Sequence, residues 1–223
     1  MTFAAAYENP PQVWGIGRVV VGDAIVPWPV SEADIEDETD VATVQLQALG
    51  LTADELVLIV SLLSQAIHVA PFERAAGRVG ALYSSADASR FDAFRTASLV
   101  RQLGASVVLG VDAAVLDGFD DLDRDPAEVF APVRAVVAAD AGAYGRLRAA
   151  GLRPGRWLRL GPFSAISRPG DETLSYDAGR WQVEATDGEL RVTNLVDRLT
   201  PCNRFTTGVA GTVLEPGRLS LAE

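Results

Sequence analysis

The chain has 223 residues and a formal net charge of −11, which excludes nucleic acid and anionic membrane surfaces as ordinary partners. Hydrophobic residues make up 48% of it, enough for one substantial core with a small appended unit. All 19 basic residues are arginines, so no lysine is available to form a Schiff base, to serve a phosphate loop or to act as a general base.

The single cysteine, Cys202, and the single histidine, His68, limit the chemistry further. One cysteine forms no internal disulfide, and one Cys with one His does not make a zinc site of the usual kind. We therefore expect no metal and a cytoplasmic location. Residues 1–11 lack the features of a secretory signal, and no apolar run approaches the ~20 residues of a membrane span. The abundance of Ala, Arg, Asp, Val and Leu indicates a bacterial protein from a GC-rich genome.

The N-terminal part predicts short strands followed by a helix. Strands are expected at residues 13–18, 19–21 and 24–26, closed by Trp28-Pro29. Residues 31–40 hold six acidic side chains, and Ser31 with Asp34 resembles a capping pattern. A solvated helix start explains this run better than a metal site. The helix itself is expected from about Glu38 to the stop at Gly50. Its expected inward positions are Val41, Val44, Leu46 and Leu49.

Strand and helix patterns then alternate along the chain. Strands are expected at residues 56–60, 80–84, 106–111, 133–138 and 157–160. Helices are expected at residues 64–79, 87–103, 112–119, 126–130 and 140–150, with Pro71 near a break or in a first turn. In the second of these helices the candidate inward positions are Phe91, Phe94, Ala97, Leu99 and Leu103. Such alternation implies right-handed crossovers and a parallel sheet.

The composition changes near residue 165. Residues 181–186 and 190–194 alternate in hydrophobicity around Asp187-Gly188, which predicts a β-hairpin with a type I′ turn. The fold class is therefore α/β, with a parallel, helix-flanked sheet followed by a small antiparallel β-rich subdomain. The predicted division places the α/β core at residues 1–165, including the β segment 13–30, and the subdomain at residues 166–223.

One block near the C-terminus carries a family resemblance. It consists of Gly188-Glu189-Leu190, Thr193 and Leu195, followed by Pro201, Arg204-Phe205 and Thr207-Gly208. The block resembles the late core motif of the adenylate-forming enzymes, in particular the phenylacetate–CoA ligase branch, which reads G-E-L-x-x-T-x-L and then P-x-x-R-[YF]-x-T-G-D. Weaker resemblances at residues 49–58 and 80–85 extend the similarity over residues 40–213. The resemblance implies the fold of part of the large N-terminal domain of these enzymes.

The departures from the family pattern concern adenylation. The family's closing Asp, which holds the ATP ribose, is Val209 here. No Ser/Thr/Gly-rich phosphate loop ending in Lys is found, and residues 160–165, in place of Y-G-x-[ST]-E, contain no Glu for Mg²⁺. We also expect no C-terminal Lys-bearing lid domain. ATP and Mg²⁺ are therefore not expected as cofactors, while CoA or an acyl thioester remains open as a ligand.

Six residues are candidates for a site, with His68 as the one candidate catalytic residue. His68 follows a core strand where the family lines its acyl pocket, so it is either a pocket residue and general base or a structural histidine. The candidate ligand-binding residues are Ser64, His68, Tyr83, Ser84, Arg204 and Thr207. Tyr83 and Ser84 are expected at the carboxyl end of a strand, where open α/β sheets bind ligands; otherwise they cap the next helix. Arg204 is equally well explained by a structural ion pair. Cys202 has no neighbour in the sequence that would activate it.

Three functional hypotheses follow. The leading one is a degenerate, truncated, non-adenylating relative of phenylacetate–CoA ligase, a pseudoenzyme of secondary metabolism. It would bind a small acyl or aryl molecule or a carrier-bound acyl group. The second is an ATP-independent enzyme that uses His68 in acid/base catalysis on an acyl or polyketide-like substrate. The third is a regulatory partner of an active ligase, with a homodimer as an open alternative.

Overall fold

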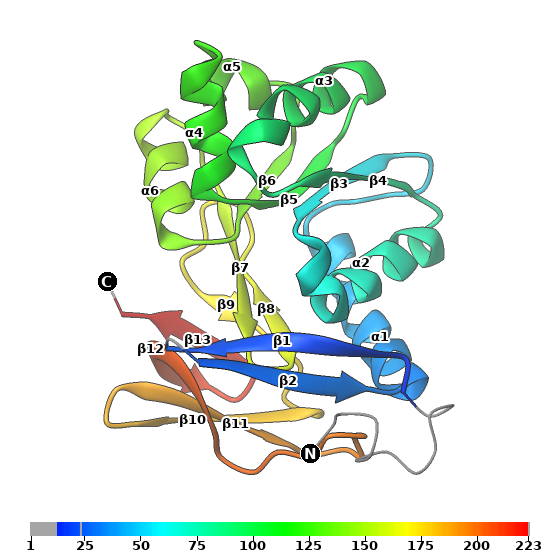
Figure 1. Ribbon diagram of the computed structural model, residues 1–223, viewed down its shortest axis with the longest axis vertical. Coiled ribbons are helices and arrows are strands. Elements are labelled where there is room, and N and C mark those ends of the chain that lie inside the picture. Colours follow the sequence, from blue (N-terminus) through cyan, green and yellow to red (C-terminus); the bar gives the residue numbers. More distant parts are fainter. Residues whose placement is uncertain (1–12, 23, 223) are drawn as a thin grey trace.

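A computed structural model describes residues 13–22 and 24–222. Eleven strands form one sheet in the order β10-β11-β12-β13-β9-β8-β7-β6-β5-β3-β4, and β1 and β2 form a separate hairpin. Figure 1 shows helices α3–α6 gathered at one end of the molecule, the antiparallel strands at the other, and β7 and β8 running between them. None of the helices in the described ranges is long and apolar enough to cross a bilayer.

The parallel half of the sheet is buried between two layers of helices. Its strands are β3 (Leu56–Ser61), β4 (Leu82–Asp87), β5 (Val107–Val111), β6 (Ala135–Ala138) and β7 (Gly155–Leu160). The helices are α1 (Glu32–Ala48), α2 (Ala66–Val79), α3 (Ala93–Leu103), α4 (Ala113–Asp121), α5 (Pro126–Phe130) and α6 (Ala141–Ala149). Helices α1 and α2 pack on one face of the sheet and α3–α6 on the other, each layer with its own apolar core. The predicted helix-flanked parallel sheet is confirmed.

The pairing becomes antiparallel after β7. Strand β7 pairs in parallel with β6 and, through the two-residue loop Gly161-Pro162, antiparallel with β8. The antiparallel strands are β8 (Phe163–Ile166), β9 (Leu174–Ser175), β10 (Trp181–Thr186), β11 (Glu189–Asn194), β12 (Phe205–Glu215) and β13 (Arg218–Leu221). Because the sheet continues across this change, the division into two units at residue 165 stays a prediction.

The N-terminal hairpin extends further than expected. Strands β1 (Gly15–Val21) and β2 (Ala24–Val30) pair along their whole length, so Trp28-Pro29 lies inside β2 and does not close it. Proline is tolerated here because a two-stranded hairpin leaves one side of each strand without ladder hydrogen bonds.

Helix α1 begins at Glu32, six residues before the predicted start. Ser31 Oγ accepts a hydrogen bond from the Asp34 backbone N–H at 3.0 Å, and Asp34 Oδ2 accepts from the Ser31 N–H at 2.7 Å, so the capping box lies at the true N-terminus. The buried stripe consists of Ile35, Thr39, Ala42 and Leu46. The predicted inward position Val44 is 66% exposed, because the side of α1 that carries Ala42 and Leu46 shares the apolar cluster with α2.

Three further predictions about element boundaries and faces were wrong. Gly80 ends α2 in the left-handed conformation, so β4 starts only at Leu82. Pro71 lies inside α2, in its second turn, and the helix continues through it. In the predicted helix 87–103, Phe91 is 92% exposed and Phe94 and Leu103 are also exposed, while Ala93, Thr96 and Val100 are buried. The small Ala93 faces inward because α4 packs against it at Gly118.

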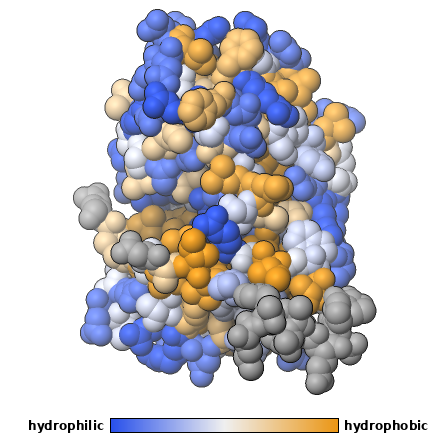
Figure 2. Space-filling view, in the orientation of Figure 1, coloured by the Kyte–Doolittle hydropathy of each residue, from blue (hydrophilic) through white to orange (hydrophobic). Residues whose placement is uncertain are grey.

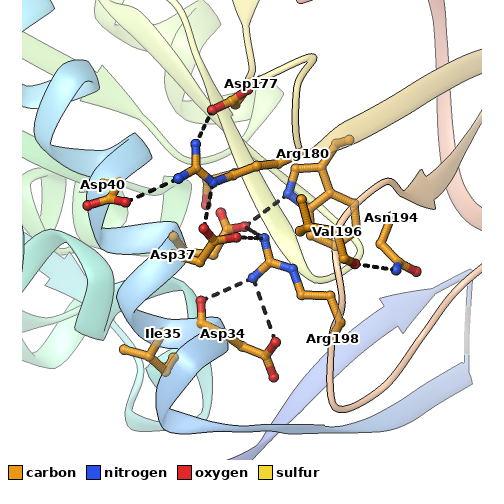
Figure 3. Close-up of polar contacts among 12 residues, drawn as sticks. Asp34, Ile35, Asp37, Asp40, Asp177, Arg180, Asn194, Val196 and Arg198 are labelled. Carbon is orange, nitrogen blue, oxygen red and sulfur yellow. Dashed lines mark hydrogen bonds and ion pairs between the residues drawn. The ribbon is translucent and has the colours of Figure 1, made fainter.

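The acidic run of α1 is used in ion pairs with four arginines. Arg74 and Arg78 of α2 pair with Glu32, Glu36 and Asp40. Figure 3 shows Arg180 and Arg198 reaching from the antiparallel half onto Asp34, Asp37 and Asp40. These pairs fasten α1 to both halves of the sheet, whereas the sequence predicted only a solvated helix start. In the part of the chain that the structure describes, no group of three or more His, Cys, Asp or Glu could hold a metal ion.

Candidate functional site

A pocket of about 270 Å³ lies where β3 and β7 end. We call it the central pocket. Its polar lining residues are Arg18, Ser64, Gln65, His68 and Arg159, and Val19, Val20, Leu62 and Gly161 complete it. Carboxyl ends of parallel strands are the usual place for ligands in open α/β sheets. The face of the molecule drawn in Figure 2 has apolar surface gathered around its middle, with a hydrophilic patch within it.

Arg159 is the second-last residue of strand β7, and it brings a positive charge into the central pocket. Its Nη1 donates a hydrogen bond to Gln65 Oε1 at 3.3 Å, and its guanidinium lies 5.1 Å from the Trp157 ring centre. Burial lowers the pKa of Arg159, and the more distant charges of Asp112 and Asp140 oppose this shift. Within residues 13–22 and 24–222 it forms no ion pair with any carboxylate.

The two nearest carboxylates are committed to helix caps. Asp112 Oδ1 accepts from the Val115 N–H at 3.0 Å, and Asp140 accepts from the N–H groups of Ala143 and Ala113. Burial also raises the pKa of Asp112. Through their negative charges, these two carboxylates therefore reduce the free-energy cost of burying the Arg159 guanidinium, without forming an ion pair with it.

His68 lies beside this arginine and is held neutral. It is 4% exposed on the first turn of α2, and its Nδ1 has no hydrogen-bond partner among the described residues. Burial, followed by the positive charge of Arg159, lowers the pKa of His68 to about 3. At neutral pH the imidazole is therefore uncharged.

The β1–β2 hairpin forms the wall opposite α2. Gly17 approaches Ile67 so closely that a Cβ would fall within 2.7 Å of Ile67 Cγ2, and Val19 is buried with Ile35 and Ile67. This contact fixes Arg18, the residue between them, at the rim of the central pocket. Arg18 is exposed and forms no ion pair within the described ranges.

A second, more apolar groove adjoins the central pocket. It has a volume of about 320 Å³, shares Leu62 with the central pocket, and is lined by Trp14, Leu63, Val69 and Ala70 among others. Leu62 lies between the two spaces, so a ligand in the central pocket would contact apolar surface at that side.

The structure brings together only part of the predicted site. Ser64 and His68 line the central pocket. Tyr83 and Ser84 do not: they lie in the middle of the edge strand β4, and the expectation that they follow the strand was wrong because β4 runs on to Asp87. They therefore do not cap the next helix either. Their role in ligand binding stays a prediction.

Arg204 and Thr207 lie in the antiparallel half and have structural contacts. The Arg204 guanidinium pairs with Glu184 at 2.8 Å, and the Arg204 N–H donates to Thr193 Oγ1. Thr207 Oγ1 donates to the Leu190 carbonyl at 2.7 Å. Neither residue lines the central pocket. The block that carries the family resemblance thus ties β11 and β12 together.

Sequence reasoning missed three residues of the central pocket, Arg18, Gln65 and Arg159. Arg159 gave the clearest signal, because it is a charged residue near the carboxyl end of an otherwise apolar strand. Arg18 and Gln65 gave none, since both sit in segments that were expected only as a strand and a helix start. Cys202 is half-buried, and burial raises the pKa of its thiol, which leaves it unactivated.

Comparisons with known proteins identify the fold. No protein-family model and no curated protein matches the sequence. An open conformation of 2-hydroxyisobutyryl-CoA ligase with 2-HIB-AMP and CoA is similar with a TM-score of 0.74 at 12% identity, over 96% of this chain and 56% of that one. Malonyl-CoA ligase with methylmalonyl-CoA and AMP has a TM-score of 0.61 at 17% identity, over 96% and 53%.

The N-terminal subdomain of Klebsiella oxytoca NpsA, in complex with anthranilyl-AMSN, is similar with a TM-score of 0.64 at 12% identity, over 93% of this chain and 63% of that one. This chain thus spans between 53% and 63% of the length of these three proteins. At such identities the likeness concerns the fold alone. The chain has the fold of part of an acyl-CoA ligase.

Proposed function

We propose that this protein binds a small acyl or aryl carboxylic acid, or its thioester, in the central pocket and does not adenylate it. The observation that carries the proposal is the charge of the lining. Among the described residues, two arginines without ion pairs, a neutral histidine, a glutamine and a serine line the pocket, and no carboxylate does, although the chain has a net charge of −11.

The Arg159 guanidinium is the group that most favours a carboxylate ligand. Taking a guanidinium out of water costs free energy that a carboxylate bound at hydrogen-bond distance would offset. The planar guanidinium can meet both carboxylate oxygens, and the neutral His68 lines the same pocket. A carboxylate is therefore the ligand group that best complements this lining.

The residues present do not fit ATP with Mg²⁺. None of the residues lining the central pocket can offer a carboxylate to a metal ion. Val209, which stands where the resembling family has its ribose-binding Asp, packs against the apolar core of the antiparallel half. We therefore propose binding without activation by a nucleotide.

The compared ligases support an acyl or aryl ligand. Their structures hold 2-HIB-AMP and CoA, methylmalonyl-CoA, and anthranilyl-AMSN, so this fold accommodates both acyl and aryl groups in those proteins. The resemblance of residues 187–208 to the phenylacetate–CoA ligase branch directs the first tests to aryl acids. With a volume near the lower end of the ~300–1,000 Å³ of ligand pockets, the central pocket suits the acyl part of a thioester and leaves its carrier outside.

The test is a thermal-shift and calorimetric titration with aryl and acyl acids, their CoA thioesters, CoA, AMP and ATP·Mg²⁺. A ligand at 100 times its Kd should stabilise the protein by about 2.7 kcal/mol. We expect shifts with acids or thioesters and none with AMP or ATP. Arg159→Gln should abolish the shifts, and Arg95→Gln, an exposed arginine of α3, should preserve them. Shifts with ATP, or no shift with any acid or thioester, would refute the proposal.

Acid/base catalysis by His68 is a second candidate function. The observation that favours it is the unpartnered Nδ1 next to Arg159. A bound carboxylate would neutralise the charge of Arg159 and raise the pKa of His68, so ligand binding itself would make the imidazole a better base. Exchange of the α-hydrogen of a bound acid or thioester into D₂O, lost in His68→Gln with ligand binding retained, would establish this function.

A further inference from the structure

We infer that the ligand of the central pocket is a dianion, with one carboxylate held inside by Arg159 and a second anionic group held at the rim by Arg18. Dicarboxylic acids are the simplest ligands of this class. The inference rests on the proposed function and adds to it a requirement for a second negative charge.

The two arginines occupy unequal positions in the central pocket. Arg159 lies in the interior of the pocket, on the central strand β7, and is tethered by Gln65. Arg18 lies on β1, on the opposite wall, and is exposed. Neither forms an ion pair within the described ranges, and the carboxylate of a monocarboxylic acid would satisfy only one of them.

The strand on both sides of Arg18 is packed against the rest of the protein. Its two neighbours along β1, Gly17 and Val19, are both buried, Gly17 directly against Ile67 and Val19 in the apolar cluster with Ile35. Ile67 precedes His68 in α2, so the wall that carries Arg18 is seated on the helix that carries His68. The backbone of Arg18 is therefore held in place beside the central pocket, and the reach of its side chain should select the length of the ligand.

The charge of the central pocket also favours a dianion. A dianion bound between the two arginines would leave the pocket neutral, because His68 is uncharged and no carboxylate lines it. In a chain with a net charge of −11, a dianion is repelled at long range more than a monoanion is, so a preference for dianions must come from these local contacts.

The experiment compares matched acids by calorimetry at low ionic strength. The probes are butanoate and butanedioate, pentanoate and pentanedioate, and benzoate with benzene-1,3- and benzene-1,4-dicarboxylate. We expect at least one dicarboxylate to bind about 10-fold more tightly than its monocarboxylate, since a hydrogen bond to a charged group has this order of effect. In Arg18→Gln this preference should vanish while monocarboxylate affinity changes little. Arg159→Gln should weaken both kinds of acid, and Arg95→Gln neither.

The outcomes separate this inference from the function on which it rests. Equal affinities for mono- and dicarboxylates in the unmodified protein, or an equal loss of both in Arg18→Gln, would overturn the dianion inference and leave acid binding standing. Failure of every acid to bind would overturn the dianion inference, and failure of the CoA thioesters as well would overturn the proposed function. Because Arg18 is exposed, Arg18→Gln should fold normally, and its unchanged thermal unfolding serves as the control.

Discussion

Gly17 of β1 and Ile67 of α2 approach each other more closely than any pair with a Cβ at position 17 could. A Cβ added to Gly17 would lie 2.6 Å from Ile67 Cγ1 and 2.7 Å from Ile67 Cγ2. This contact seats the hairpin on α2 beside His68, and it therefore shapes the central pocket without touching a ligand.

Gly17→Ala should accordingly destabilise the protein by about 1–3 kcal/mol, the usual cost of overpacking a well-filled site, and weaken acid binding. Gly15→Ala is the matched control in the same strand, because nothing lies within 4 Å of its added Cβ. It should change the free energy of unfolding by no more than about 0.5 kcal/mol. Urea unfolding of both variants measures the difference, and equal effects would show that the close approach is relaxed in solution.

His68 should make stability depend on pH in a definite direction. Its pKa in the folded protein is about 3, below the ordinary value of about 6.5, so the unfolded chain takes up the proton first as the pH falls. Above pH 6.5 His68 makes its full contribution to the free energy of unfolding, and this contribution is lost as the pH falls toward 3. Between pH 7.5 and 5.0 the loss should be about 2 kcal/mol.

The measurement is urea unfolding of the unmodified protein and of His68→Gln at pH 7.5 and 5.0. Other groups that titrate in this range contribute to both proteins, so the difference between the two slopes isolates His68. An imidazole that titrates near pH 6.5 in a nuclear magnetic resonance titration, or identical slopes for the two proteins, would contradict the neutral buried state.

Local signals in the sequence predicted what depends on neighbouring residues. Asp187 and Gly188 adopt φ angles of 54° and 80°, as the predicted turn requires, and Ser31 and Asp34 form the capping box. The alternation of apolar strands and amphipathic helices was sufficient for the parallel sheet. The start of α1 was missed because its six carboxylates repel one another in isolation and are offset only by arginines from α2 and from residues 180 and 198.

The site depends on tertiary contacts and was predicted less well. Ser64 and His68, both expected just after a core strand, line one pocket, and their part in ligand binding stays a prediction. Arg159 is joined to Gln65 across 94 positions of the chain, and Arg18 reaches the same pocket from a hairpin that belongs to a different sheet. No local pattern records such juxtapositions. Phe91 and Phe94 were expected to be buried and are exposed. Hydrophobicity alone does not decide which side chains face the neighbouring helix, where Gly118 lies against Ala93.

Arg198 and Glu38 form a buried pair whose disruption should be costly. Arg198 Nη2 donates to Glu38 Oε1 at 2.7 Å, and the two side chains are only 5% and 11% exposed. Burial raises the pKa of Glu38, and the positive charge of Arg198 acts in the opposite direction. Arg198→Met should cost about 3–5 kcal/mol, because it leaves Glu38 in the interior without its cation.

The double variant Arg198→Met/Glu38→Gln should be more stable than Arg198→Met alone, since it removes the unpaired charge. Arg148→Met, which breaks the exposed pair with Glu172, is the control and should cost about 0.5 kcal/mol or less. Urea unfolding at pH 7 measures these three variants and the single variant Glu38→Gln, which completes the double-mutant cycle. Additive costs for Arg198 and Glu38 would mean that the two side chains act independently.

Gln65→Glu should block the central pocket from within. Gln65 Oε1 accepts hydrogen bonds from Arg159 Nη1 at 3.3 Å and from the Leu62 N–H at 3.1 Å, and a glutamate of the same shape can keep both. Its added negative charge would pair with Arg159 and compete with a ligand carboxylate, so acid affinity should fall by about 10-fold or more while the fold is retained. Gln65→Met, which has similar size and no charge, should lose less affinity. Calorimetric titration of both variants makes the comparison, and undiminished acid binding in Gln65→Glu would show that Arg159 is not the counter-ion of the ligand.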